Sequence, residues 1–248
     1  MTKRVAFVTG GNGGIGSAIC RELAQQGHVV VAGYFPPEKD DAEAWQKQLK
    51  DEGVDISLSA VDVSNFEDCE RAVAKVADEF GSIDILVNCA GITRDGTLKK
   101  MSEANWKAVM STNLDSAFNM TRQVINGMLD KGWGRIVNIA SVNGQRGQFG
   151  QANYSAAKAG MHGFTMAVAL ETAAKGITVN TVSPGYIATA MTKAMPEKVL
   201  ESIVNSVPMR RMGTPEEIAN TVAWLASEGN GYTTGANIPV NGGLFTSH

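Results

Sequence analysis

A tyrosine and a lysine stand four residues apart in the stretch QANYSAAKAG, residues 151–160. Their neighbours are nearly all small, and alanine favours a helix, so Tyr154 and Lys158 are expected one turn apart on a single helix face. A phenol can give a proton to a developing alkoxide, and a nearby ammonium lowers its pKa by favouring the phenolate. Alone, the pair is a weak motif that also fits an ordinary amphipathic helix.

A glycine-rich turn is the second candidate for chemistry. The stretch TGGNGGIG follows an apolar β-type run and precedes a helical pattern. Gly11, Gly13 and Gly16 satisfy G-x-G-x-x-G, whereas Gly10, Gly14 and Gly16 satisfy T-G-x-x-x-G-x-G. Either register would let a pyrophosphate approach a helix N-terminus. A turn that merely packs is the alternative, but the position in the first strand–helix unit favours nucleotide binding.

The second predicted strand ends at Gly33 and Tyr34. An acid there would bind the ribose 2′-hydroxyl of NAD, and an arginine would accept the 2′-phosphate of NADP. Neither is present. The following residues Glu38–Asp41 carry three acids and one lysine, and Asn12 in the glycine turn is uncharged. A phosphate would therefore meet net negative charge, which favours NADH.

Composition narrows the class of protein. Of 248 residues, 44% are hydrophobic and 19% are charged, which suits a globular core. A net charge of −3 gives no basic surplus for nucleic acid or an anionic membrane. The three cysteines have no C-x-x-C spacing, and no signal-peptide or membrane-length pattern is seen, so a cytoplasmic protein is expected. The three histidines lack metal-ligand spacing, so no metal site is expected.

Short β-branched runs alternate with helical patterns along the whole chain. The strands are expected at residues 4–9, 28–33, 56–63, 83–88, 135–140, 177–183 and 236–240, and the helices include residues 15–26, 66–80, 103–129, 152–175 and 215–227. Continuous apolar strands are typical of a sheet buried on both faces. The expected fold is therefore α/β, with a single doubly wound Rossmann-type parallel sheet of about seven strands and helices on both faces. Residues 1–248 are predicted to form one domain, because residues 35–41, the loosest stretch, are too short for a linker.

Several motifs occur in a fixed order: TGGNGGIG, NCAG, TNL, NIASVNG, YSAAK and a Pro-Gly pair. Together they resemble the classical short-chain dehydrogenase/reductase family over nearly the whole chain. The resemblance is closest to members that reduce acetoacetyl-CoA in polyhydroxyalkanoate synthesis, on the stretches ITRD, SVNGQRGQFGQANYS, SPGYIAT and VNGGLF. The usual N-N-A-G element has Cys89 in place of its second asparagine. We interpret Cys89 as a small structural residue and not as a nucleophile.

The resemblance implies a catalytic set of Asn113, Ser141, Tyr154 and Lys158. Tyr154 would donate the proton, and Lys158 would hold the nicotinamide ribose. Ser141 would bind the substrate carbonyl, and Asn113 would bind a water that connects Lys158 to solvent. Ser141 and Asn113, taken singly, could instead be capping residues.

The resemblance also implies contacts with the cofactor and the substrate. Cofactor contacts are expected at Gly10, Asn12, Gly14, Ile15, Gly16, Gly33, Tyr34, Asp62, Val63, Asn88, Ala90, Gly91, Tyr154, Lys158, Pro184, Gly185, Ile187 and Thr189. Substrate contacts are expected at Asp95, Ser141, Gln148, Phe149, Gln151, Tyr154 and Tyr186. The alternatives are that Asp62 is a turn acid, that Gln148 and Gln151 are solvated, and that Phe149 belongs to the core.

The implied activity is the NAD(P)H-dependent reduction of acetoacetyl-CoA to 3-hydroxybutyryl-CoA, in a homotetramer paired through its C-terminal strand and helices. Residues Met191–Met195 would belong to a lid. Family members as a group suggest NADPH, whereas the acidic residues after the second strand suggest NADH, which we favour slightly. A 3-oxoacyl-carrier-protein reductase is the alternative within the family. A nucleotide-sensing binding protein without turnover is the alternative outside this class of enzyme.

Overall fold

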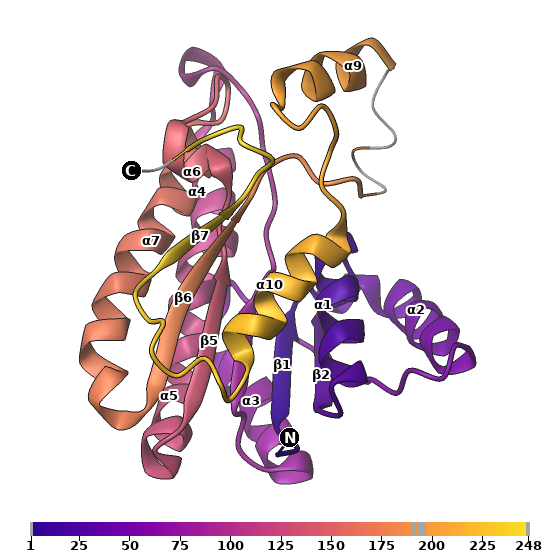
Figure 1. Ribbon diagram of the computed structural model, residues 1–248, viewed down its shortest axis with the longest axis vertical. Helices are drawn as coiled ribbons and strands as arrows, with labels where there is room; N and C mark the ends of the chain where they lie inside the picture. Colours follow the sequence, from indigo (N-terminus) through magenta and orange to yellow (C-terminus); the bar gives the residue numbers. More distant parts are fainter. Residues whose placement is uncertain (1, 190–191, 193–196, 247–248) are drawn as a thin grey trace.

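Seven parallel strands form one sheet in the computed structural model, which describes residues 2–189, 192 and 197–246 (Figure 1). The strands are β1 (Val5–Thr9), β2 (Val29–Tyr34), β3 (Ser57–Ala60), β4 (Ile85–Asn88), β5 (Gly134–Ile139), β6 (Ile177–Pro184) and β7 (Asn237–Val240). Their order is β3-β2-β1-β4-β5-β6-β7, and all six pairings are parallel. The predicted doubly wound sheet is confirmed. The strand order reverses between β1 and β4, so their carboxyl ends border the crevice where such sheets bind ligands.

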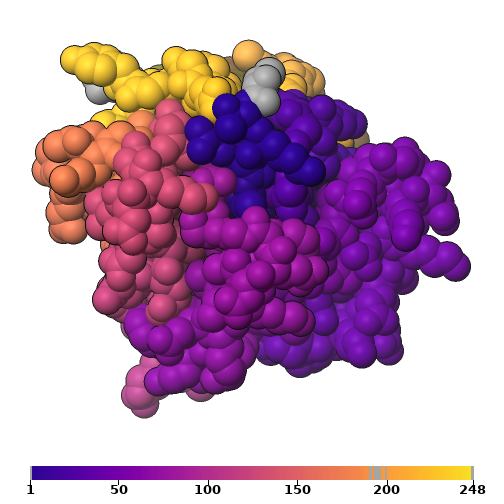
Figure 2. All heavy atoms as spheres, turned by 90° about the horizontal axis from the view of Figure 1, so that it is seen from below, coloured from indigo at the N-terminus to yellow at the C-terminus, as the bar shows by residue number. Residues whose placement is uncertain are grey.

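Helices cover both faces of the sheet. They are α1 (Gly14–Gln25), α2 (Lys39–Asp51), α3 (Phe66–Phe80), α4 (Glu103–Met110), α5 (Ser116–Lys131), α6 (Val142–Arg146), α7 (Ala152–Thr172), α9 (Glu197–Ser206) and α10 (Pro215–Ala226). The view from below shows the amino end of the sheet, where the indigo first residues lie beside yellow C-terminal ones (Figure 2). Among the described residues, no helix combines the length and the apolar character needed to span a membrane.

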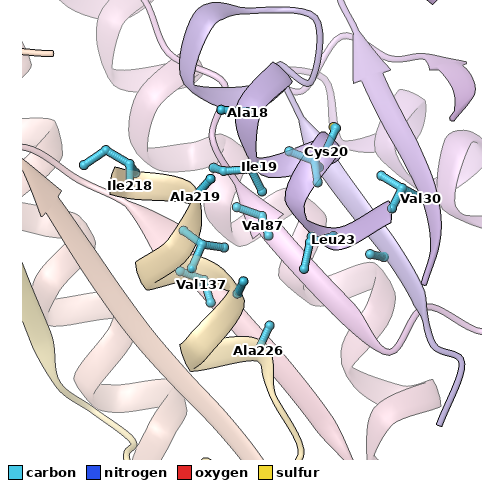
Figure 3. Close-up of a cluster of buried hydrophobic side chains, with 14 of the residues drawn as sticks. Ala18, Ile19, Cys20, Leu23, Val30, Val87, Val137, Ile218, Ala219 and Ala226 are labelled. Carbon is cyan, nitrogen blue, oxygen red and sulfur yellow. The ribbon is translucent and has the colours of Figure 1, made fainter. Parts of the chain in front are cut away.

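Alternation along the strands builds two cores. Val87 of β4 packs in a cluster with α1 and α10, and its neighbour Leu86 packs in a second cluster with α3, α5 and α7. Figure 3 shows the first cluster, where Ile19 of α1 and Ala219 of α10 approach each other above the strands. Successive side chains on a strand point to opposite faces, so the predicted apolar runs are explained by burial on both sides.

The structure differs from the predicted elements in three places. The stretch after β2, predicted as a loop, becomes a 3₁₀ turn at Pro36–Glu38 and then α2, because prolines suit a helix start and acids suit its first turn. The predicted helix over residues 103–129 is interrupted by a π-helical turn, Ser111–Asp115. The third strand ends at Ala60, before the turn at Asp62. The predicted lid at Met191–Met195 lies outside the described residues, except for Thr192.

Candidate active site

A buried chain of polar side chains fixes α7 to the sheet. Asn88 donates from Nδ2 to Asn138 Oδ1, Asn138 donates from Nδ2 to Thr165 Oγ1, and Thr181 donates to the same hydroxyl, each at 2.8 Å. All four residues are buried. These three bonds link α7 to β4, β5 and β6, so the strands together set the position of the helix that carries Tyr154 and Lys158. Asn88, predicted as a cofactor contact, commits its side-chain nitrogen to this network.

Lys158 is an almost fully buried cation, with 3% of its surface exposed. Its Nζ donates to the carbonyl oxygen of Ile139, at the end of β5, over 2.7 Å. The same nitrogen lies 5.7 Å from the centroid of the Tyr154 ring. Burial lowers the pKa of Lys158 to about 8, and no Asp or Glu among the described residues offsets this effect. The ammonium and the phenol are therefore neighbours, as the spacing predicted.

The pKa of Tyr154 is raised above its usual value, chiefly by burial. A hydrogen bond with Ser141 acts in the opposite direction, and the charge of Asp95 adds to the increase. The expected net lowering of this pKa is wrong for the protein alone, because burial dominates and the ammonium donates to Ile139. Ser141 caps α6, and its Oγ accepts from Asn143 N at 3.1 Å, so its own proton remains available for the phenol or a carbonyl.

Asn113 lies in the π-helical turn and faces Lys158. Its Nδ2 donates to the carbonyl oxygens of Ile92 and Val109, both at 2.9 Å, while its buried Oδ1 has no partner in the described structure. A Cβ placed on Gly91 would lie 2.6 Å from Asn113 Oδ1 and 3.6 Å from Lys158 Nζ. An acceptor and a donor thus border one small space, which suits a bridging water. π-Helical turns recur at functional sites.

The glycine turn has the geometry of the register T-G-x-x-x-G-x-G. Gly10 has φ +62°, and a Cβ on Gly16 would lie 2.1 Å from Gly10 O. A Cβ on Gly14 would lie 2.9 Å from Thr189 Cγ2, so the turn meets the segment that follows β6. Two predicted groups of cofactor residues, distant in sequence, are therefore adjacent. Only glycine permits this tight turn and close backbone approach.

Thr9, which the sequence analysis did not single out, ties the glycine turn to the loop after β4. Its Oγ1 accepts from the backbone nitrogens of Cys89 and Ala90, at 3.0 and 3.1 Å. Its position at the end of β1, directly before the glycines, was the available signal. Burial raises the pKa of the Cys89 thiol to about 11, so the thiol is neutral, which agrees with its interpretation as a structural residue.

The turn after β2 places an acid against the glycine turn. Asn12 donates from Nδ2 to Glu38 Oε2 at 3.1 Å. Lys39, the cation that could offset this charge, pairs with Glu43 at 3.6 Å. Asp62 Oδ1 accepts from both the backbone nitrogen and the hydroxyl of Ser64, which is the turn role weighed as its alternative.

The predicted substrate residues fall into separate groups. Gln151 donates from Nε2 to Asp95 Oδ2 at 3.0 Å, across the mouth beside Tyr154. Gln148 and Phe149 lie on the neighbouring exposed loop, and Phe149 is 88% exposed, so it is not a core residue. Tyr186 lines a cavity of about 340 Å³ together with residues before α10 and after β7. The structure thus brings Asp95 and Gln151 together, whereas Tyr186 lines the cavity near the end of β7.

The other predicted cofactor residues lie at or just beyond the carboxyl ends of the strands. They are Ile15 after β1, Gly33 and Tyr34 in β2, Val63 after β3, Ala90 and Gly91 after β4, Pro184 in β6, and Gly185 and Ile187 after it. Within the described ranges, no three His, Cys, Asp or Glu side chains are grouped as metal ligands would be.

The chain matches known proteins over nearly its whole length. A model of the protein family described as enoyl-(acyl carrier protein) reductase matches residues 10–245. An acetoacetyl-CoA reductase of Allochromatium vinosum is 61% identical over 98% of both chains, and one of Cupriavidus necator is 57% identical over 98% of this chain and 99% of its own. A 3-oxoacyl-[acyl-carrier-protein] reductase of Vibrio cholerae is 46% identical over 98% of this chain and 97% of its own.

Proposed function

The chain belongs to the short-chain dehydrogenase/reductase family, and from this premise we propose that it reduces acetoacetyl-CoA to 3-hydroxybutyryl-CoA for polyhydroxybutyrate synthesis. The observation that carries the proposal is the convergence of Ser141, Tyr154, Lys158 and Asn113 at the carboxyl end of β4 and β5. Relatives that share 47–61% of their residues with this chain and are named acetoacetyl-CoA reductases support the substrate.

The residues present fit a nicotinamide cofactor. The turn around Gly10 and Gly16 leaves no room for side chains, so backbone can approach a pyrophosphate at the start of α1. When bound, NAD(P)H supplies the hydride. The glycine turn meets Thr189, and Gly91 borders Asn113 and Lys158, which supports the predicted contacts of Thr189 and Gly91 with the cofactor.

Tyr154 and Ser141 have different roles at the substrate carbonyl. Ser141 donates to the oxygen and stabilises the negative charge that develops there. Tyr154, whose raised pKa keeps it protonated at neutral pH, gives its proton to that oxygen. Lys158 stabilises the phenolate that this transfer leaves, and Asn113 Oδ1 holds the water that brings in the next proton.

We infer that NADH is preferred over NADPH. Glu38, held against Asn12, would face a 2′-phosphate with like charge, whereas its carboxylate can accept from a 2′-hydroxyl. Lys39 is turned toward Glu43 and offers little compensation. The opposite preference would mean that a cation reaches the phosphate when the cofactor binds.

The deciding experiment is steady-state turnover of acetoacetyl-CoA with NADH and with NADPH, repeated with acetoacetyl-carrier protein. Turnover of the CoA thioester at a higher kcat/KM supports the proposal. A higher kcat/KM on the carrier protein would favour the 3-oxoacyl-carrier-protein reductase, which the relative from Vibrio cholerae keeps open. Cofactor binding without turnover of either thioester would favour a binding protein.

We also propose that the enzyme is a cytoplasmic homotetramer that pairs through β7 and α10. Trp224 of α10 is 50% exposed and Tyr232, just after it, is fully exposed, so this C-terminal region presents large side chains to solvent. Light scattering coupled to size-exclusion chromatography should give the mass of four chains, and Trp224→Lys should reduce it. A monomeric mass for the unaltered protein would refute the assembly.

A further inference from the structure

Three side chains form a chain of hydrogen bonds between the starts of α6 and α7 and the loop after β4. Asn143 donates from Nδ2 to Gln151 Oε1 at 2.9 Å, and Gln151 donates from Nε2 to Asp95 Oδ2 at 3.0 Å. A backbone bond from Gly96 N to Gly150 O, 2.8 Å long, holds the two loops together. The carboxamide of Gln151 is therefore held at both ends by residues 8 and 56 positions away in the sequence.

The chemistry of Asp95 sets the direction of the whole chain of bonds. An ionised carboxylate only accepts hydrogen bonds, so Gln151 must turn its nitrogen toward Asp95 and its oxygen toward Asn143. Asn143 must then present its own nitrogen. The buried Oδ1 of Asn143 has no partner in the described structure, so the bond to Gln151 alone orients this amide. One N–H of Gln151 Nε2 remains for another acceptor.

This chain of bonds lies beside the catalytic pair. The backbone nitrogen of Asn143 donates to Ser141 Oγ at 3.1 Å, and the charge of Asp95 contributes to the raised pKa of Tyr154. Gln151 stands three residues before Tyr154, directly before α7. A 3-oxoacyl thioester carries two carbonyl groups separated by one carbon. With its ketone between Ser141 and Tyr154, its thioester carbonyl would lie close by, as an acceptor for the remaining N–H of Gln151.

On the premise of the proposed reduction, we propose that Asn143 and Asp95 are positioning residues that hold the N–H of Gln151 toward the thioester carbonyl. They act through Gln151 and select substrates in which one carbon separates the ketone from a second carbonyl. Asn143 was not among the residues expected from the sequence. Asn143 contributes by fixing which way the Gln151 carboxamide points. Exchanging an amide for a carboxylate can reverse that orientation without removing any side chain.

The test uses Asn143→Asp, Asp95→Asn and the two together, with KM for acetoacetyl-CoA, KM for the cofactor and the thermal midpoint as readouts. The carboxylate introduced by Asn143→Asp cannot donate, so this variant should raise KM for acetoacetyl-CoA about tenfold, the value of one good hydrogen bond. It should also lower the thermal midpoint, because two carboxylates then compete for one nitrogen. KM is chosen over kcat because Asp95 also acts on Tyr154.

The double variant separates positioning from simple structural support. It keeps the net charge of the site and allows the bonds to form in the reverse direction, with the Gln151 amide turned over. We expect its thermal midpoint to recover and its KM for acetoacetyl-CoA to stay high, while KM for the cofactor is unchanged throughout. Recovery of that KM together with the midpoint, or an unchanged KM in Asn143→Asp, would overturn the inference.

Two controls complete the design. Asn126→Asp makes the same chemical change at an exposed position of α5 and should leave all three readouts unchanged. The unaltered enzyme serves as the control for the proposed function. If it does not reduce acetoacetyl-CoA, the proposed function fails. If it does reduce acetoacetyl-CoA but Asn143→Asp has the same KM for this substrate as the unaltered enzyme, only the positioning role fails.

Discussion

The two ends of the sheet hold buried charge in opposite ways. At the amino end, Asp84 is 4% exposed and accepts from Lys131 Nζ at 2.6 Å and from the backbone nitrogen of Val5 at 3.0 Å. At the carboxyl end, Lys158 is buried to a similar degree, and its hydrogen bond goes to the uncharged carbonyl of Ile139. One buried charge is neutralised, and the other is not.

The other cations at the amino end each have several partners, although burial lowers the pKa of Arg135 as it lowers that of Lys158. The Arg135 side chain donates to the carbonyl oxygens of Gly134, Gly176 and Ser227, and its guanidinium lies 4.5 Å from the centroid of Trp133. Arg4 covers the same ring at 3.8 Å and bonds Glu228 at 3.0 Å. Figure 2 shows this end, with the first residues lying against the segment that follows α10.

Compensation stabilises the fold, whereas its absence leaves a group ready to react. A buried cation without an acid carries a desolvation cost, and that cost appears as the lowered pKa of Lys158. The unpartnered Asn113 Oδ1 lies in the same region. Strain of this kind is typical of functional sites and is offset elsewhere in the molecule. Substitutions at the two ends should therefore separate activity from stability.

The largest effect is expected from Tyr154→Phe at the carboxyl end. Loss of the proton donor should lower kcat by about 10²- to 10⁴-fold, the usual contribution of a general acid. Cofactor affinity and the thermal midpoint should change little, because the ring is kept. Stopped-flow or steady-state oxidation of the cofactor measures the rate, and fluorescence titration measures the affinity. Retention of more than a tenth of kcat would remove Tyr154 from the mechanism.

At the amino end, Asp84→Ala should affect stability and spare catalysis. It removes the acceptor of the Val5 nitrogen and the charged partner of Lys131, which keeps only its bond to Ser82 O, and it should lower the free energy of unfolding by about 3 kcal/mol. Urea unfolding measures the loss, and kcat well below the melting range should stay within twofold. Glu103→Ala is the matched control, because it removes an exposed pair with Lys107 and should cost less than about 1 kcal/mol. Equal losses in both variants would contradict the comparison.

Lys158→Met reverses the sign of the stability effect. A pKa lowered from 10.5 to about 8 corresponds to about 3 kcal/mol of destabilisation at neutral pH. The lost bond to Ile139 returns roughly 1 kcal/mol of that, so the variant should gain about 2 kcal/mol while losing activity. Arg135→Met, at the other end, should instead destabilise, because several carbonyl oxygens lose their donor. A loss of stability in both variants would remove the distinction between the two ends.

The parts of this molecule that depend on local pattern were predictable. Burial on both faces makes strands such as β2 continuously apolar, so the seven-stranded sheet follows from the sequence. Tyr154 and Lys158 share a helix face because helical spacing requires it. The segment Pro36–Asp41 was misjudged because its prolines and acids suit a loop and a helix start equally well.

The contacts that depend on tertiary packing were not predictable. Asn12 and Glu38 meet only because β1 and β2 are neighbours in the sheet, and Asp95 meets Gln151 across 56 residues. Burial decides that the pKa of Tyr154 rises, and Lys158 donates to Ile139; spacing along a helix reveals neither. Residue types and their order identified which residues belong to the site, whereas tertiary packing determines which of them form hydrogen bonds with one another.

The unbalanced charge also predicts a dependence of activity on pH. Lys158 loses its proton as pH rises through about 8, whereas the pKa of Tyr154 lies above its usual value near 10. The kcat/KM for reduction should therefore fall about tenfold per pH unit above about 8, because the remaining phenol is no longer supported by a cation. Lys158→Arg, which stays charged, should have a lower kcat/KM that does not fall further above about pH 8. A flat profile of the unaltered enzyme up to about pH 10 would contradict the assignment.

The smallest effect is expected from His162, one turn beyond Lys158 on α7. Both of its ring nitrogens are buried without a partner in the described structure, and burial followed by the charge of Lys158 lowers its pKa. The folded protein then binds fewer protons than the unfolded chain, so stability is lost as pH falls below about 6.5. His162→Gln removes the proton, so its urea midpoint should decline less between about pH 7 and pH 5 than that of the unaltered protein. In a Lys158→Met background the effect of His162→Gln on this decline should be smaller, since the charge that repels a protonated His162 is gone. An equal effect of His162→Gln in both backgrounds would show that His162 does not sense Lys158.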